Sequence, residues 1–89
     1  MIKAYKIKVK GRVQGVGFRY YTLNMANKFK VKGTVQNIND YVEIVCRGNP
    51  DNLSEFLAKV RKGPALSNVL KLDIEEIENQ KNLAEFKII

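Results

Sequence analysis

Apolar and polar residues alternate along four segments of the chain, and this period of two predicts β-strands. The pattern is clearest in residues 4–10, where Tyr5, Ile7 and Val9 alternate with lysines. A similar alternation extends over three more segments, and a short apolar stretch ends the chain. We therefore predict further strands at residues 31–38, 41–47, 69–77 and 86–89.

Between these strands, apolar residues recur at the spacing of two amphipathic helices. The first predicted helix spans residues 18–29. The second carries its apolar stripe on residues 53–60 and follows Asn49 and Pro50, which suit an N-cap and a first helical position. We expect this helix to end at the Gly-Pro pair of residues 63–64.

The resulting order of elements is βαββαβ with a short fifth strand at the C-terminus, which predicts an α+β, ferredoxin-like sandwich. In that fold two right-handed crossovers interleave, so both helices cover one face of an antiparallel sheet with strand order 4-1-3-2. The first two strands are then parallel, and their C-terminal ends meet the same sheet edge about 10 Å apart. The loop after the first strand is therefore expected to face Asn37.

With 89 residues, the chain is expected to form a single domain over residues 1–89, near the lower size limit for one hydrophobic core. It has one cysteine, so no internal disulfide can form. Cys46 occupies an apolar position of a strand, which favours a buried structural thiol over a nucleophile. The chain has no histidine that could activate it.

No apolar run is long enough to cross a bilayer, and the N-terminus lacks the features of a signal peptide. We therefore expect a cytoplasmic protein, and we expect it to be a monomer. The formal net charge of +7 invites a nucleic-acid interpretation, because clustered basic residues release counterions from a phosphate backbone. The lysines are scattered, however, which favours a solvated polar face that helps small anions approach.

Residues 11–19, with the sequence GRVQGVGFR, carry the strongest indication of function. Three glycines within seven residues allow a tight turn with inward N–H groups, and Arg19 lies where a helix is predicted to begin. This combination suits a phosphoryl group. Neither GxGxxG nor GxxxxGK[ST] fits the run, so no nucleotide is implied. A bare turn between a strand and a helix is the alternative interpretation.

This run and the sequence GTVQN at residues 33–37 closely resemble the acylphosphatase family, whose signatures are GxVQGVxFR and GxVxN. The resemblance covers essentially the whole chain, including the order of its elements. It implies hydrolysis of acyl phosphates, which are carboxylic–phosphoric anhydrides, to a carboxylate and inorganic phosphate. It also implies that no metal or cofactor takes part.

The resemblance further implies that Arg19 binds the phosphate and that Asn37 positions the attacking water. Both are therefore the expected catalytic residues. The phosphate-binding residues implied with them are Gln14, Gly15, Val16, Gly17, Phe18 and Arg19. In some relatives the terminal carboxylate braces the arginine, which suggests the same role for Ile89.

A site with so few side chains fits the chemistry of this reaction. The parent acid of a carboxylate leaving group has a pKa of about 4 to 5, so no strong proton donor is needed. Phosphoryl transfer depends on positioning and charge stabilisation, which backbone N–H groups and a forked guanidinium supply. An asparagine amide orients water, although it cannot act as a base.

Three features depart from the family pattern. The turn at Asn39 and Asp40 is one residue shorter than the usual Asp-Gly turn. The loop that borders the acyl side of the site is therefore expected to differ, so the family pattern does not determine the substrate preference. Thr34 replaces a common tryptophan. Lys30 stands where a helix-ending glycine is frequent, and a left-handed lysine there would cost up to about 1 kcal/mol.

Two alternatives stay open. A nucleic-acid-binding module of the same topology would need aromatic residues on the open face of the sheet, where the strands offer only Tyr5 and Tyr41. A non-catalytic domain of the same family would bind an anion for regulation or handle carbamoyl phosphate within a larger assembly. The presence of both Arg19 and Asn37 argues against this second alternative.

Overall fold

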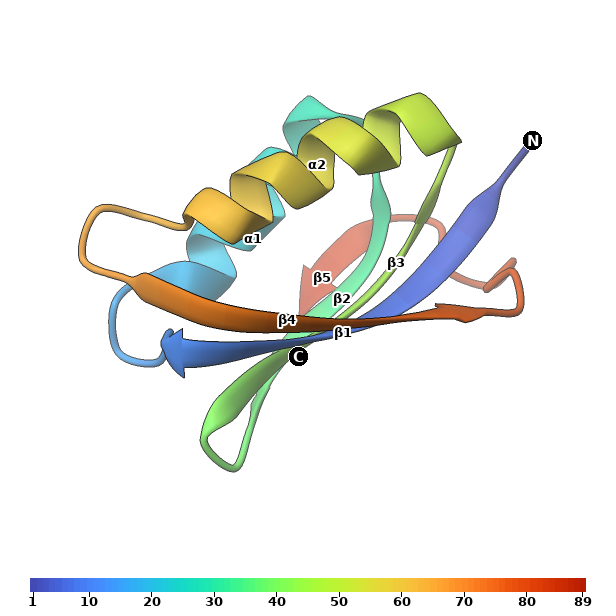
Figure 1. The fold of residues 1–89 in the computed structure, drawn as a ribbon. Coiled ribbons are helices and arrows are strands. Elements are labelled where there is room, and N and C mark those ends of the chain that lie inside the picture. Colours follow the sequence, from blue (N-terminus) through green and yellow to red (C-terminus); the bar gives the residue numbers. More distant parts are fainter.

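The computed structural model describes all of residues 1–89. Its seven elements follow in the predicted order (Figure 1): β1 (Lys3–Arg12), α1 (Phe18–Lys28), β2 (Lys32–Ile38), β3 (Tyr41–Gly48), α2 (Pro50–Lys62), β4 (Asn68–Ile77) and β5 (Phe86–Ile88). Strand β1 exceeds its predicted length because its pairing with β4 continues past a register shift between Lys10 and Gly11.

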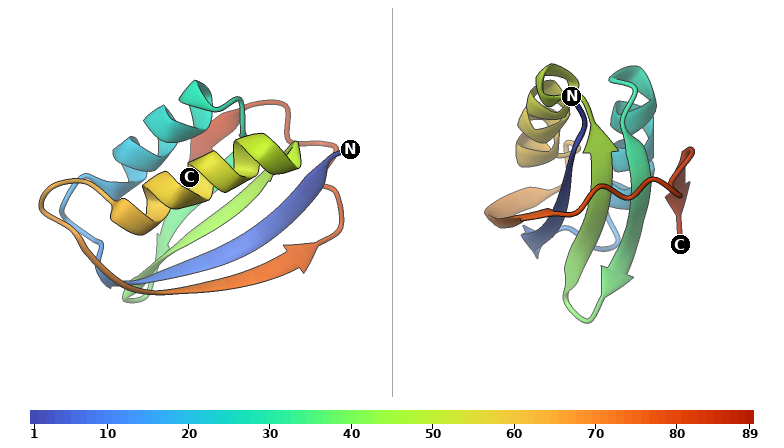
Figure 2. Two further views of the ribbon diagram at one scale, coloured as in Figure 1. Left: turned by 45° about the horizontal axis from the view of Figure 1, so that its top comes forward. Right: turned by 90° about the vertical axis from the view of Figure 1, so that its right-hand side faces the viewer.

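The sheet has the strand order β4-β1-β3-β2-β5, which confirms the predicted arrangement of the first four strands. One feature of the predicted antiparallel sheet is wrong, because β5 pairs with β2 in parallel and makes the sheet mixed. After β4 the chain reverses direction and crosses to the far edge, where β2 runs the same way as β5 (Figure 2, right).

Both helices cover one face of the sheet, as predicted (Figures 1 and 2). The start of α1 is tied to the end of α2, because the Tyr21 hydroxyl donates a hydrogen bond of 2.8 Å to the carbonyl of Lys59. No helix is both long and apolar enough to span a membrane. The core between helices and sheet consists of Ile7, Val9, Val13, Phe18, Ala26, Val31, Val35, Val42, Ile44, Cys46, Leu53, Phe56, Val60 and Phe86.

The predicted helix ends of α2 are confirmed. The side chain of Asn49 accepts a hydrogen bond of 2.8 Å from the N–H of Asn52, and Gly63 ends the helix with a φ of 68°. After α1, Lys30 adopts the left-handed conformation expected of it, with a φ of 59°. The chain therefore accepts about 1 kcal/mol of strain at a position that glycine would satisfy freely.

Cys46 is fully buried in β3, which confirms the predicted structural thiol. Burial raises the pKa of the thiol to about 12, and its sulfur lies 3.7 Å from the carbonyl oxygen of Tyr5, to which it donates. A thiol with such a pKa is not ionised near neutral pH, so Cys46 does not supply a nucleophile.

Gly33 is required where β2 passes β3. Its φ is 150°, and a Cβ at this position would overlap the carbonyl oxygen of Val45 on the neighbouring strand. Only a residue without a side chain allows this approach, which keeps β2 in register with β3 as far as Asn37.

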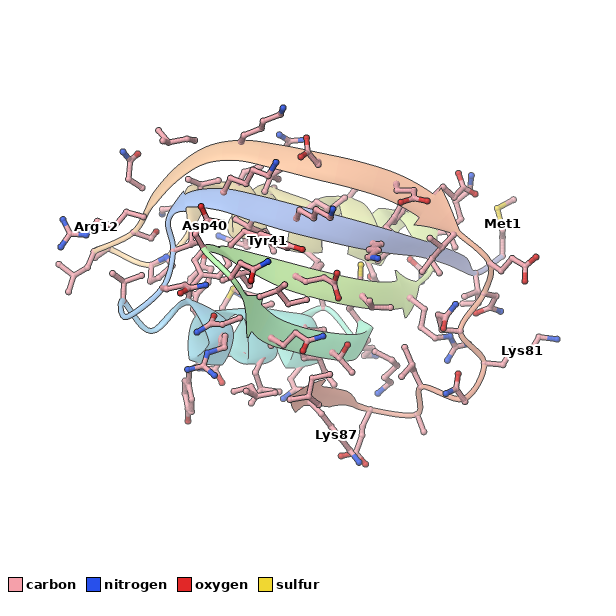
Figure 3. All side chains as sticks on the ribbon, turned by 90° about the horizontal axis from the view of Figure 1, so that it is seen from below. Met1, Arg12, Asp40, Tyr41, Lys81 and Lys87 are labelled. Atoms are coloured by element: carbon pink, nitrogen blue, oxygen red, sulfur yellow. The ribbon has the colours of Figure 1, made fainter.

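The face of the sheet opposite the helices is charged but largely self-paired. Figure 3 looks onto this face, where Tyr41 lies near the turn that carries Asp40. The lysines of β1 contact neighbouring strands: Lys6 lies 3.6 Å from Glu43, Lys10 lies 3.1 Å from Asp73, and the Lys8 ammonium lies 5.5 Å from the centroid of the Tyr41 ring.

Candidate active site

The loop between β1 and α1 and the end of β2 lie at the same edge of the sheet, where the topology predicted them (Figure 2, left). They border one pocket of about 220 Å³. Of the predicted site residues, the structure brings Gly15, Gly17, Arg19 and Asn37 together around this pocket. Val13, Tyr20 and Ile88 complete its lining.

The backbone of the loop has the properties of an anion cradle. Gly15 and Gly17 have φ values of 72° and 78°, in the left-handed region that favours glycine. A Cβ at either position would meet no other protein atom within 4 Å, so conformation rather than crowding calls for glycine. None of the N–H groups of residues 13–17 donates to another backbone group. These donors are free to bind an anion.

Helix α1 begins at the pocket with an unusual charge pattern. Gly17 provides no side-chain cap, and the first turn contains no acidic residue, whereas α2 has both a capping Asn49 and an acidic Asp51. Arg19 instead places a positive charge at the positive end of the helix dipole. This arrangement costs about 0.3–1 kcal/mol near the surface, and a bound anion would offset it.

The side chain of Arg19 is exposed and takes part in no ion pair. In particular, the structure does not contain the ion pair expected between Arg19 and the Ile89 carboxylate. Ile89 is instead held through its backbone, whose N–H donates a hydrogen bond of 3.0 Å to the carbonyl of Val35. The Arg19 guanidinium therefore keeps all its donors for a ligand.

Asn37 borders the pocket from strand β2, on the other side from the glycine loop. It lies two residues after the buried Val35 on β2, so its side chain shares the face that the helices cover. The side chain is exposed because the strand has passed beyond the helices at this point. The amide thus lies across the pocket from the loop and borders the same volume as Arg19.

Three of the predicted phosphate-binding residues turn their side chains away from the pocket. Phe18 is buried in the core, and Val16 is half-buried against it. The Gln14 amide donates hydrogen bonds of 3.0 Å to the carbonyls of Asn39 and Tyr41. Only the backbone N–H groups of these three residues are available for an anion.

The Gln14 amide therefore connects two distant segments, because its two partners lie 25 and 27 residues further along the chain. One segment is the glycine loop, and the other is the turn between β2 and β3 that follows Asn37. Sequence reasoning did not find this link, because a glutamine has no preferred partner that its neighbours reveal.

Sequence reasoning also missed the apolar lining of the pocket. Tyr20 follows Arg19 directly, but nothing in the sequence pattern marks it as a pocket residue. Val13 lies inside the glycine run. The contribution of Ile88 depends on the register of β5 against β2, in which it pairs with Val35.

Histidine, cysteine and carboxylate side chains do not gather anywhere in groups of three that could hold a metal ion. No carboxylate borders the pocket, and Arg19 is its one charged residue. The site therefore combines a single cation and free backbone donors on one side with an amide on the other.

Comparison with known proteins identifies the family of this chain. The family model described as Acylphosphatase matches residues 5–88. The chain is 44% identical to an acylphosphatase of Staphylococcus haemolyticus over 89 residues, covering 99% of this chain and 100% of that protein. The crystal structure of acylphosphatase from Bacillus subtilis superposes with a TM-score of 0.93 at 38% identity, covering 100% and 99% of the two chains.

A second kind of structural relative is much longer. The crystal structure of full-length HypF in a phosphate- and nucleotide-bound form matches with a TM-score of 0.94 at 32% identity. The match covers 100% of this chain but only 12% of that one.

Proposed function

The chain belongs to the acylphosphatase family and hydrolyses acyl phosphates, and from this premise we propose how its pocket performs the reaction. The backbone N–H groups of residues 14–19 and the Arg19 guanidinium hold the phosphoryl group. Asn37 positions the water that attacks it. The observation that carries this proposal is the shared pocket, which Arg19 and Asn37 border from two different elements.

Charge stabilisation is the role of the loop and Arg19. In the loose transition state of phosphoryl transfer, negative charge spreads over the equatorial oxygens of the phosphoryl group. The free N–H groups of residues 13–17, the start of α1 and the unpaired guanidinium are preorganised donors for those oxygens. The guanidinium adds two parallel hydrogen bonds that fix the orientation of the group.

Orientation of the nucleophile is the role of Asn37. Its side-chain carbonyl accepts a hydrogen bond from the water and aims the oxygen at phosphorus, which lowers the entropic part of the barrier. As the water attacks, the bond from phosphorus to the bridging oxygen breaks and the carboxylate leaves with that electron pair. The water's protons pass to the phosphate and the solvent, because no side chain of the pocket is a base.

The reaction is expected to proceed unchanged in a chelator. Benzoyl phosphate hydrolysis, followed by phosphate release, should have the same rate in buffer with EDTA as without it. The stabilising charges come from Arg19 and backbone donors, so no Lewis acid is required. Loss of activity in EDTA that returns when magnesium or zinc is added would contradict this part of the proposal.

We propose a positioning role for Gln14, because its amide holds the glycine loop against the turn after Asn37. Gln14→Ala should lower kcat for benzoyl phosphate about 10- to 100-fold, since a shift of about 1 Å between reacting groups has effects of that size. KM should change much less, because the phosphate donors of the loop remain. Steady-state kinetics give both parameters.

A matched control is Gln36→Ala. Gln36 donates a weak hydrogen bond of 3.4 Å to Glu43 on the face of the sheet away from the helices, so its loss should leave kcat unchanged. Equal kinetics for the Gln14 and Gln36 variants would refute the positioning role.

We propose that residues 1–89 act as a single-domain monomer in the cytoplasm, on a small anionic substrate rather than a nucleic acid. The pairing of Lys6 and Lys10 with carboxylates argues against nucleic-acid binding, because paired lysines release few counterions from a phosphate backbone. The contact of Lys8 with Tyr41 further occupies one of the two aromatic rings that base stacking would need.

A further inference from the structure

Part of the pocket lining is apolar, and these side chains have no part in the proposed binding of phosphate or water. Three elements contribute to it: Val13 from the loop, Tyr20 from α1 and Ile88 from β5. Val13 is buried, whereas Tyr20 is 64% exposed and Ile88 is 39% exposed. The two exposed side chains therefore form the accessible apolar surface beside Arg19.

The aromatic neighbours of Tyr20 on α1 make contacts within the protein that Tyr20 does not make. Phe18 is buried in the core, and Tyr21 donates its hydroxyl to the carbonyl of Lys59. These two rings also pack against each other, with centroids 6.2 Å apart. Tyr20 makes neither an aromatic contact nor a side-chain hydrogen bond within the protein. Its exposed ring is available to a ligand.

Ile88 faces the pocket because of the register of β5. It pairs with Val35 and has the same alternation as the buried Phe86, so it lies on the helix-covered face. The next residue of β2 on that face is Asn37. An apolar side chain thus stands beside the polar end of the site.

An acyl phosphate, like the pocket, has a charged part and a part that can be apolar. Its phosphoryl group carries the negative charge, and its acyl group is joined to phosphorus through one bridging oxygen. Because one bridging oxygen joins the two parts, an acyl group whose phosphoryl group is held by Arg19 stays close to this pocket, which Tyr20 also borders. Arg19 is the only charged residue around the pocket, so nothing there would pair with a charged acyl group.

We infer that Tyr20 and Ile88 form an acyl-binding subsite that favours aromatic and branched apolar acyl groups over the acetyl group. This inference rests on the proposed function, because it assumes that the phosphoryl group is held by Arg19 and the loop. The apolar contact adds binding energy remote from phosphorus, which a larger acyl group uses and an acetyl group does not.

The test compares benzoyl phosphate with acetyl phosphate in variants of the full chain. Tyr20→Ala should lower kcat/KM for benzoyl phosphate about 3- to 10-fold, the range expected for one aromatic contact, and leave acetyl phosphate nearly unchanged. Ile88→Ala should have the same selectivity with a smaller effect. Tyr20→Phe should behave as the wild type, because the ring and not the hydroxyl makes the contact.

The control is Leu70→Ala, which removes an apolar side chain that is 73% exposed on β4 and does not border the pocket. This variant should change kcat/KM for neither substrate. Equal losses on both substrates in the Tyr20→Ala variant, or no loss on benzoyl phosphate, would overturn the subsite. Unchanged acetyl phosphate hydrolysis in the same variants would leave the proposed function intact, whereas a wild type inactive on both substrates would overturn the proposed function itself.

Discussion

Arg19→Ala is expected to lower kcat/KM for benzoyl phosphate about a thousandfold or more. A positioned arginine that stabilises the charge of a transferring phosphoryl group contributes on the order of 10³–10⁵ in rate. Here it is the one charged residue bordering the pocket, and no other cation is placed to replace it. Initial rates of phosphate release over a range of substrate concentrations give the value.

Arg19→Lys distinguishes the shape of the guanidinium from its charge. Lysine keeps the charge but cannot offer two parallel donors, so activity should remain close to that of the alanine variant. Both variants should fold normally, because Arg19 is exposed and takes part in no ion pair. Either variant retaining more than half of the wild-type activity would refute the assignment of Arg19.

Asn37→Ala is expected to lower kcat by about 100-fold or more, while inorganic phosphate still binds. Losing one preorganised polar group at a reacting centre costs about 10²–10³ in kcat. The phosphate donors lie on the loop and on α1, and none of them is changed by this substitution. The measurements are kcat for benzoyl phosphate and the inhibition constant of inorganic phosphate.

The inhibition constant decides between two roles for Asn37. An unchanged constant together with a low kcat separates the water-positioning group from the phosphate cradle. If phosphate no longer inhibits the Asn37→Ala variant, Asn37 belongs to the cradle, and the division of the site into two halves is wrong.

Local signals in the sequence were sufficient to predict most of the fold. The alternation around Ile7 and Val9, the cap at Asn49 and the break at Gly63 each depend on residues close in sequence. Once seven elements are placed, the handedness of crossovers leaves few sheet orders. The same topology predicted that the glycine loop and Asn37 share a sheet edge.

The features that sequence reasoning missed depend on contacts between distant segments. The parallel pairing of β5 requires knowing which edge of the sheet a three-residue strand joins. The place of Ile88 in the pocket follows from that pairing. The hydrogen bonds of the Gln14 amide depend instead on how the glycine loop packs against the turn between β2 and β3. No periodicity or short motif encodes them. The residues on the acyl side of the site could therefore be identified only from the structure.

Hydrolysis of benzoyl phosphate in ¹⁸O-labelled water tests most directly the central claim that water attacks the phosphoryl group and not the acyl carbon. Mass spectrometry of the two products locates the new oxygen. The account predicts that ¹⁸O appears in inorganic phosphate and is absent from benzoate, because the bond between phosphorus and the bridging oxygen breaks. Label in benzoate would mean that water attacks the acyl carbon, and it would contradict the account.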